Sequence, residues 1–148
     1  MLGSVHNINN QKLRIVLNEH NPQGYQLYFE ELYNMVSAAD IDVIAHLDLM
    51  KCHGYKEYGI YRFEDYQEII QQILKKAIER NIGIEINSSG LRAGLKQTLP
   101  SMNIIQLYKE LGGEILTIGS DLTQSRNRWR QSDGSLSFSE GMWIYLYL

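Results

Sequence analysis

The stretch Ile41-Asp42-Val43-Ile44-Ala45-His46 decides how the rest of the chain is interpreted. It is β-branched at its centre, and a run of this length and composition predicts a strand of about six residues. On either side of it, residues 24–39 and 64–80 carry apolar side chains at the spacing of amphipathic helices. The centre of the chain is therefore predicted to contain a strand between two helices.

The same alternation continues in both directions along the chain. Residues 2–6 form a short apolar start that ends at a histidine, and strands are predicted at 84–87 and 114–118, with a helix at 100–111 between them. Residues 51–62, which include three tyrosines and two glycines, are expected to form a loop. Repeated strand-then-helix units favour an α/β fold in which helical crossovers join parallel strands.

Composition excludes several classes of protein. The chain has 148 residues, of which 44% are hydrophobic and 21% charged, so it is neither disordered nor fibrous. A formal charge of −3 argues against nucleic-acid binding, which needs a basic face. No apolar run approaches the ~20 residues that span a bilayer. The lone cysteine, Cys52, excludes an internal disulfide framework and leads us to expect a cytoplasmic location.

Polar side chains follow four of the predicted strands. His6, His46, Asn87 and Asp121 come at strand ends, and about 40, 41 and 34 residues separate them, roughly one βα unit each. In a parallel βα barrel, such strand ends converge on one face, which carries the chemistry. Two imidazoles and a carboxylate at that face are suitable ligands for zinc, manganese or iron.

Alternation along the strands adds two carboxylates to this picture. Glu85 is expected on the same side as Asn87, and Asp42 on the same side as His46. Residue types alone do not make a metal site, because a strand-end histidine is more often a hydrogen-bonded structural residue. The role of Glu85 is left open at this point, between shaping the pocket and pairing with a basic neighbour.

Four blocks of the sequence resemble one family of enzymes. They are Gly3-Ser4-Val5-His6, Asp42-Val43-Ile44-Ala45-His46-Leu47-Asp48-Leu49, Glu85-Ile86-Asn87-Ser88-Ser89-Gly90-Leu91-Arg92, and Leu111-Gly112-Gly113-Glu114 followed by Thr117-Ile118-Gly119-Ser120-Asp121. In this order and spacing, the blocks are similar to those of histidinol phosphatases of the PHP (polymerase and histidinol phosphatase) superfamily. The resemblance covers nearly all of residues 2–121.

The resemblance implies a distorted, TIM-like parallel βα barrel with a multinuclear cluster of divalent metal ions, zinc, manganese or iron, at its mouth. The implied metal ligands are His6, His46 and Asp121, and the implied substrate-binding residues are Asn87, Ser88 and Arg92, with no catalytic residue beyond the metal site. The family reaction is hydrolysis of L-histidinol phosphate to L-histidinol and phosphate in histidine biosynthesis. Arg92 also has a plainer interpretation, that of a solvated loop residue.

The chain also departs from the family pattern. The opening part, with its paired histidines in a His-x-His motif, is absent, so we expect a partial barrel that lacks the N-terminal strands and an incomplete cluster. The remaining histidines, His20 and His53, are expected to be solvated loop residues. After Asp121 the family continues with Ala-His, whose histidine is a ligand, whereas Leu122-Thr123 stands here.

The family pattern stops after Asp121, and a shift of reading frame would account for this. The codons GCT CAC ACA GTC GAG specify the family-like Ala-His-Thr-Val-Glu, and one base late they give Leu-Thr-Gln-Ser-Arg, as found at 122–126. We therefore divide the chain into 1–121, the C-terminal portion of a PHP barrel domain, and 122–148, an aberrant tail that we hypothesise to be frameshifted. Sequencing the encoding DNA tests this hypothesis.

Three functions remain open from the sequence. The first is a histidinol-phosphatase-type, metal-dependent phosphomonoesterase, impaired in this chain; the others are another PHP phosphoesterase and a catalytically inactive fragment. The expected partner is a small phosphorylated substrate, L-histidinol phosphate, with no nucleic acid and no membrane. Strands with unpaired edges lead us to expect self-association as well.

Overall fold

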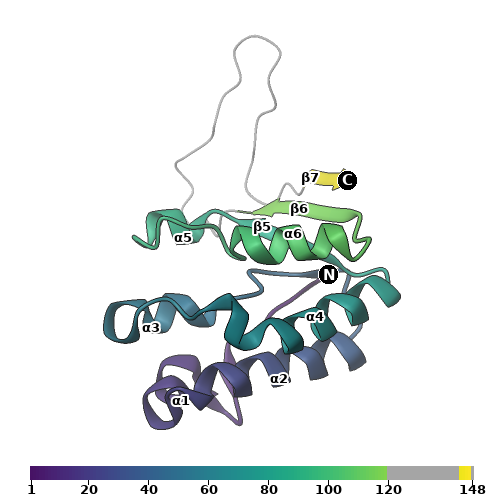
Figure 1. Ribbon diagram of the computed structural model, residues 1–148. Coiled ribbons are helices and arrows are strands. Elements are labelled where there is room, and N and C mark those ends of the chain that lie inside the picture. The colour runs from purple at the N-terminus through teal and green to yellow at the C-terminus, as the bar shows by residue number, and fades with distance from the viewer. Residues whose placement is uncertain (120–143, 148) are drawn as a thin grey trace.

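The computed structural model describes residues 1–119 and 144–147, and these contain a five-stranded sheet (Figure 1). The strand order is β1-β4-β5-β6-β7. The bounds are Leu2–Gly3 for β1, Val43–Ile44 for β4, Gly83–Asn87 for β5, Ile115–Gly119 for β6 and Ile144–Tyr147 for β7. The first four of these strands are parallel to one another, which confirms the α/β fold with a parallel sheet.

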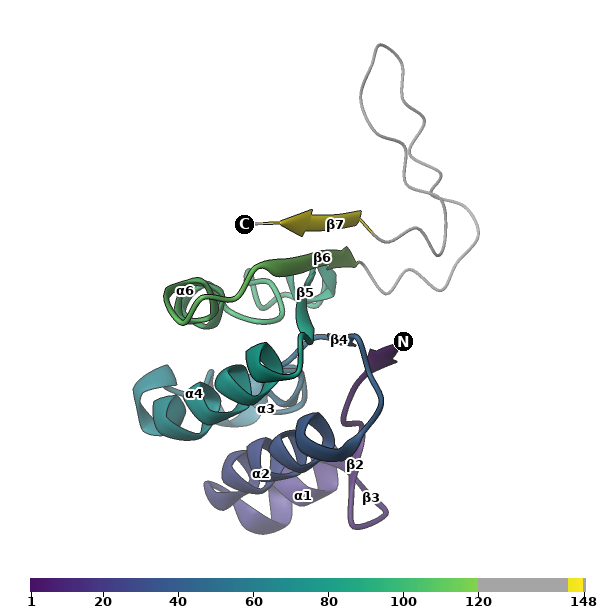
Figure 2. The ribbon, with the colours of Figure 1, turned by 90° about the vertical axis from the view of Figure 1, so that its right-hand side faces the viewer.

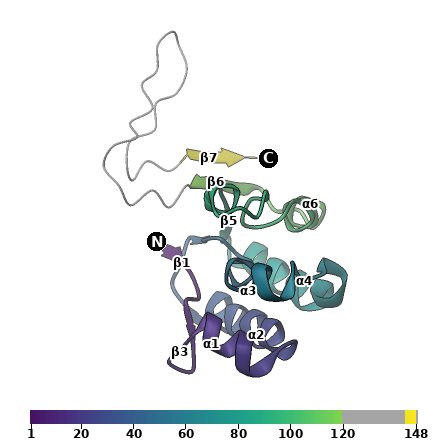
Figure 3. The ribbon, with the colours of Figure 1, turned by 90° about the vertical axis from the view of Figure 1, so that its left-hand side faces the viewer.

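The helices lie on one side of these strands (Figures 2 and 3). They are α1 (Leu13–His20), α2 (Gln23–Ala38), α3 (Met50–Tyr58), α4 (Phe63–Glu79), α5 (Ser89–Arg92) and α6 (Met102–Glu110). A small antiparallel hairpin of β2 (Asn7–Ile8) and β3 (Gln11–Lys12) precedes α1. No helix in the described part of the chain is long and apolar enough to cross a membrane.

Helices α2 and α4 form most of the layer behind the sheet because each carries one continuous apolar stripe. On α2, Phe29 and Leu32 are completely buried, and on α4, Ile70 and Ile73 are completely buried. The two helices pack against each other. The predictions of helices at 24–39 and 64–80 are thus confirmed to within one residue at each end, because this periodicity follows the helical repeat.

The prediction of a loop over 51–62 is wrong, since α3 occupies most of it. Gly54 explains how α3 fits: a Cβ atom there would lie 2.3 Å from Cδ2 of Leu17 on α1, so any larger residue would force the Leu17 side chain to shift. Gly54 is therefore a packing residue of a short helix against α1, and the hydroxyl of Tyr58 donates to Oδ1 of Asn18 on α1 at 3.0 Å.

Strand β7 lies within the tail that departs from the family pattern. It pairs antiparallel with β6, with Ile115 opposite Tyr147 and Ile118 opposite Ile144. The expectation of an open edge on the last parallel strand is therefore wrong, and β7 itself was not predicted. The remainder of the tail, including the 124–130 stretch, lies outside the described residues. At the other end of the sheet, β1 pairs with β4 on one side only, as far as the described residues go.

Candidate functional site

The structure brings His6 and His46 together at the end of two adjacent parallel strands. Gly3 of β1 is paired with Ile44 of β4, and each histidine follows its strand by two or three residues. Their ring centroids are 5.2 Å apart and their planes are inclined at 76°. His46 is buried, with 6% of its surface exposed, whereas His6 is exposed. The imidazole of His46 is therefore buried, whereas that of His6 lies at the surface.

Glu85 lies on the next strand, β5, and holds the backbone at His46. Its side chain is buried, with 1% exposed, and Oε2 accepts a hydrogen bond from the backbone N–H of His46 at 2.8 Å. A buried carboxylate needs such a donor, because burial without one costs several kcal/mol. The sequence left the role of Glu85 open. In the structure its carboxylate accepts a hydrogen bond from the backbone of His46 and so holds the main chain beside the histidine pair.

Asp42 precedes β4 and His46 follows it, so the two residues lie at opposite ends of the strand, and their sharing one face stays a prediction. The exposed carboxylate of Asp42 forms an ion pair with the amino group of Met1.

The backbone of His46 has a positive φ of 30°, a conformation that residues other than glycine rarely adopt. Three hydrogen bonds enforce this turn: the bond to Glu85, one from Ala45 N–H to the carbonyl of Gly3 at 2.9 Å, and one from Leu49 N–H to the carbonyl of His46 at 2.9 Å. A strained residue that the surroundings hold in place is typical of a functional position.

This strain leads to a first prediction. We expect His46→Gly to unfold at a higher urea concentration than His46→Ala, because glycine relieves about 1–2 kcal/mol of left-handed strain that alanine retains. Urea titrations of both variants, followed by circular dichroism, measure the difference. A glycine variant that is less stable than the alanine variant would contradict the strained geometry.

Asn87 ends β5 and begins the next loop. It is completely buried, and its Oδ1 accepts a hydrogen bond from the backbone N–H of Ser89 at 2.9 Å, a turn that starts α5. Its backbone is bridged to Leu99, with N–H···O distances of 2.8 and 2.9 Å in the two directions. Asn87 therefore connects β5 to the loop that precedes α6.

The structure also brings Ser88 and Arg92 together. Nη1 of Arg92 lies 3.4 Å from Oγ of Ser88, and the backbone N–H of Ser88 donates to the carbonyl of Gly119 at the end of β6, at 3.0 Å. Arg92 is exposed and Ser88 is half-buried. A guanidinium at this place, beside a hydroxyl, can bind a phosphate group with two parallel hydrogen bonds.

Asp121, the third expected metal ligand, lies outside the described residues, two positions after β6 ends. Among the residues that the structure does describe, no group of three His, Cys, Asp or Glu side chains is arranged to hold a metal ion. The imidazoles of His6 and His46 fit a borderline metal such as zinc as two of its ligands. They do not complete a ligand set on their own.

The two other histidines lie on helices rather than in loops. His20 is the last residue of α1, exposed, with its Nε2 4.0 Å from Oε2 of Glu19. His53 is on α3, and its pKa is lowered by partial burial and by the positive charges of His6 and Arg14. Their expected exposure to solvent is confirmed, but the loop assignment is wrong.

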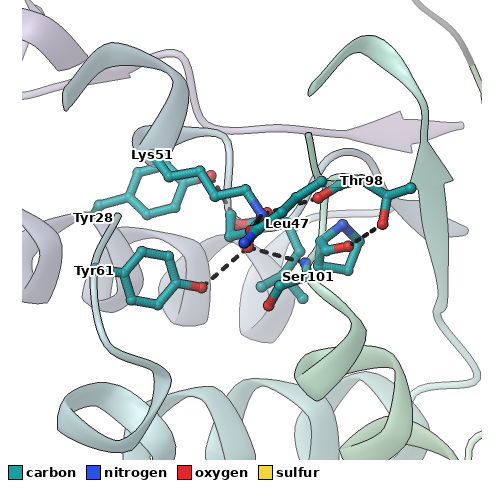
Figure 4. A network of polar contacts seen from close by, with 9 residues as sticks. Tyr28, Leu47, Lys51, Tyr61, Thr98 and Ser101 are labelled. Atoms are coloured by element: carbon teal, nitrogen blue, oxygen red, sulfur yellow. Dashed lines mark hydrogen bonds and ion pairs between the residues drawn. The ribbon is translucent and has the colours of Figure 1, made fainter. Parts of the chain in front are cut away.

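A buried ion pair between Asp48 and Lys51 lies next to the site and was not anticipated (Figure 4). Both side chains are completely buried, and Nζ of Lys51 is 2.8 Å from Oδ2 of Asp48. Burial raises the pKa of Asp48, and the ammonium of Lys51 opposes this rise. Tyr61 also donates its hydroxyl to the same Oδ2, at 3.1 Å.

Comparisons with known proteins identify the family. The model of the PHP domain matches residues 1–89. Three curated proteins named "Probable histidinol-phosphatase" are similar to the chain: that of Clostridium acetobutylicum is 31% identical over 126 residues, that of Thermotoga maritima 29% over 100, and that of Schizosaccharomyces pombe 29% over 133. They match 82%, 68% and 81% of this chain, but 49%, 40% and 43% of the relatives. The chain thus spans about half the length of the curated relatives it matches.

One solved structure is similar in fold. The crystal structure named "putative histidinol phosphatase hisK", from Listeria monocytogenes, superposes with a TM-score of 0.55 and 21% identity, over 66% of this chain and 39% of that chain. This likeness concerns the fold and supports an α/β architecture with a parallel sheet. The family model matches more than half of the chain and agrees with the four sequence blocks. The chain therefore belongs to the PHP domain family.

Proposed function

We propose that this chain is part of a histidinol-phosphatase-type, metal-dependent phosphomonoesterase that hydrolyses L-histidinol phosphate in histidine biosynthesis. The observation that carries the proposal is the pairing of His6 with His46 at the ends of adjacent parallel strands, 5.2 Å apart between ring centroids. The names of the three curated relatives support the choice of substrate. The finer architecture that we propose is a partial βα barrel.

His6, His46 and Asp121 are the proposed metal ligands. The rings of His6 and His46 lie 5.2 Å apart between centroids, and two imidazoles are suitable ligands for a zinc ion that Asp121 would also bind. A bound divalent ion of zinc, manganese or iron would lower the pKa of its water and neutralise phosphate oxygens. In this chain the hydrogen bond from the backbone N–H of His46 to Glu85 holds the main chain from which this ligand would reach the metal.

Asn87, Ser88 and Arg92 are the proposed substrate-binding residues. The guanidinium of Arg92 lies 3.4 Å from the hydroxyl of Ser88, which follows β5 directly. A guanidinium donates to two phosphate oxygens at once, which suits a phosphomonoester. Asn87 acts through the backbone, because its side chain starts the turn that carries Ser88 and Ser89.

Two other functions stay as alternatives for this chain. One is hydrolysis of a different phosphomonoester by the same metal site, and the other is a catalytically inactive fragment. The inactive fragment is favoured by Leu122-Thr123, which stand where the resembling family has Ala-His. Residues 1–121 as a barrel portion, 122–148 as a frameshifted tail, a cytoplasmic location and self-association through the open edge of β1 also remain our proposals.

Metal binding tests the proposed function directly. We expect zinc to bind the full chain in calorimetry, and His46→Ala and His6→Ala each to weaken the affinity by at least about a hundredfold, since each removes a ligand rather than a neighbour of one. His20→Ala is the matched control, because it removes an exposed imidazole from α1 and should leave the affinity unchanged.

Hydrolysis distinguishes the alternatives. If phosphate is released from L-histidinol phosphate in the presence of zinc or manganese, and His46→Ala abolishes the release, the phosphatase is supported. Release of phosphate from other phosphomonoesters, but not from L-histidinol phosphate, favours the alternative in which the same metal site hydrolyses a different substrate. A chain that binds no divalent metal and releases no phosphate overturns the proposed function and leaves the inactive fragment.

A further inference from the structure

Three segments that lie far apart in the sequence meet at the buried pair of Asp48 and Lys51 (Figure 4). The first is the turn after β4, which contains Asp48, together with the start of α3, which contains Lys51. The second is the loop before α4, which supplies Tyr61, and the third is the loop before α6, which supplies Thr98 and Ser101. The pair therefore lies where the start of α3 meets the loops before α4 and α6.

Each charged group is shared between segments. Oδ2 of Asp48 accepts hydrogen bonds from Nζ of Lys51 at 2.8 Å, from the hydroxyl of Tyr61 at 3.1 Å and from the backbone N–H of Ser101 at 3.1 Å. Nζ of Lys51 donates to the carbonyl of Thr98 at 2.9 Å. The carboxylate of Asp48 and the ammonium of Lys51 each form a hydrogen bond with the loop of residues 97–101. Removing either charged group therefore breaks a contact between this loop and the segment that follows β4.

Both loops held in this way carry expected site residues. Asp48 is two residues after His46, within the turn closed by the bond from Leu49 N–H to the carbonyl of His46. On the other side, Leu99 lies between Thr98 and Ser101 and is bridged to Asn87 in both directions. The ion pair therefore connects the backbone at His46 to the backbone at Asn87.

Stability alone does not explain a buried ion pair. Replacement of such a pair by apolar or neutral side chains of similar size is often neutral or stabilising, because desolvation cancels much of the attraction. Elsewhere in the described chain, Lys76 and Glu79 form an ion pair with the same i,i+3 spacing and the same 2.8 Å distance, but at an exposed place on α4. The pair at Asp48 differs because it is completely buried and bonded to a second loop.

We propose that Asp48 and Lys51 are positioning residues that hold the loop carrying His46 in register with the loop bridged to Asn87. The proposal rests on the proposed function, since it takes His46 and Asn87 to belong to the metal and phosphate site. In this role the pair touches neither metal nor substrate. It sets the relative position of two loops that each contribute to the site.

The test uses a double variant that keeps the fold. Asp48→Asn combined with Lys51→Met removes both charges together and leaves no uncompensated ion, so a melting temperature near that of the wild type is expected. Lys76→Met is the control for loss of an ion pair without loop contacts. Amide hydrogen exchange by NMR and zinc calorimetry are measured on all three full-length proteins.

In the double variant, the backbone N–H groups of Asn87, Leu99 and Ser101 should exchange at least about tenfold faster than in the wild type, since local opening of the loop then costs less. The N–H of Gly83, which donates to Asp42 at the opposite end of the sheet, should be unaffected. Zinc affinity should fall by about tenfold. Lys76→Met should change none of these quantities.

A double variant that melts like the wild type and keeps wild-type exchange rates at all three amides overturns the positioning role. Unchanged exchange accompanied by a lower melting temperature also overturns it, because the pair then only stabilises the fold. If the wild type binds no zinc in calorimetry, this result counts against the proposed function. The amide exchange rates then decide by themselves whether the pair positions the loops.

Discussion

Lys51→Met is expected to lower the free energy of unfolding by about 3–5 kcal/mol. Lys51 is completely buried, and its ammonium is the nearest positive charge to the carboxylate of Asp48. Methionine has a similar length but no charge, so the variant leaves the buried carboxylate with only the hydroxyl of Tyr61 and the backbone N–H of Ser101. Burial of the Asp48 carboxylate raises its pKa, and the ammonium of Lys51 opposes this rise. Without Lys51, the cost of burying the charged carboxylate is far less offset.

Urea titration monitored by circular dichroism measures this loss. Lys76→Met removes an ion pair of the same spacing and length, but one that is exposed to solvent, and should leave the free energy of unfolding nearly unchanged. Adding Asp48→Asn to Lys51→Met should recover most of the lost stability, because no buried charge remains. Equal losses for the Lys51 and Lys76 variants would show that the buried pair is no more important than the surface pair.

Glu85→Ala is expected to lower the free energy of unfolding by about 1–3 kcal/mol and to change the environment of His46. Oε2 of Glu85 accepts the backbone N–H of His46 at 2.8 Å, in a place where the carboxylate is 1% exposed. Alanine leaves this buried donor without its acceptor. The left-handed backbone at His46 then loses one of the three hydrogen bonds that enforce it.

Glu85→Gln is the matched variant, because its side-chain amide keeps an oxygen that can accept the same N–H. We expect it to stay within about 1 kcal/mol of the wild type, as is usual when a hydrogen bond is preserved. The NMR signals of the His46 amide and ring should move in Glu85→Ala and remain nearly in place in Glu85→Gln. Signals that move equally in both variants would contradict the role of the hydrogen bond.

The regular elements could be predicted from the sequence where a repeating pattern was long enough. The α2 and α4 helices each have four turns of apolar periodicity, which fixes both their existence and their ends. The α3 helix was missed because its packing depends on Gly54, a residue that usually marks a loop, and on the position of Leu17 in a helix that is itself short.

The candidate site was predictable in part for similar reasons. Parallel strands bring their carboxyl ends to one edge, so the neighbourhood of His6 and His46 followed from the order of strands. The pairing of Asp48 with Lys51 did not, because an Asp and a Lys three residues apart usually form a solvated pair on a helix surface. Its burial results from Tyr61 and from the loop at 97–101, which no local pattern reveals.

The antiparallel direction of β7 has a consequence for any strand that could extend the sheet. An additional strand that paired in parallel with this edge of β6 would need the same backbone N–H and C=O groups, from Ile115 to Ile118, that already pair with β7. Since β7 belongs to the same chain, its pairing with β6 is intramolecular, whereas a separate polypeptide must first associate with the protein. Growth of the sheet past β6 is therefore a competition between tethered and free strands, and the tethered strand has the advantage.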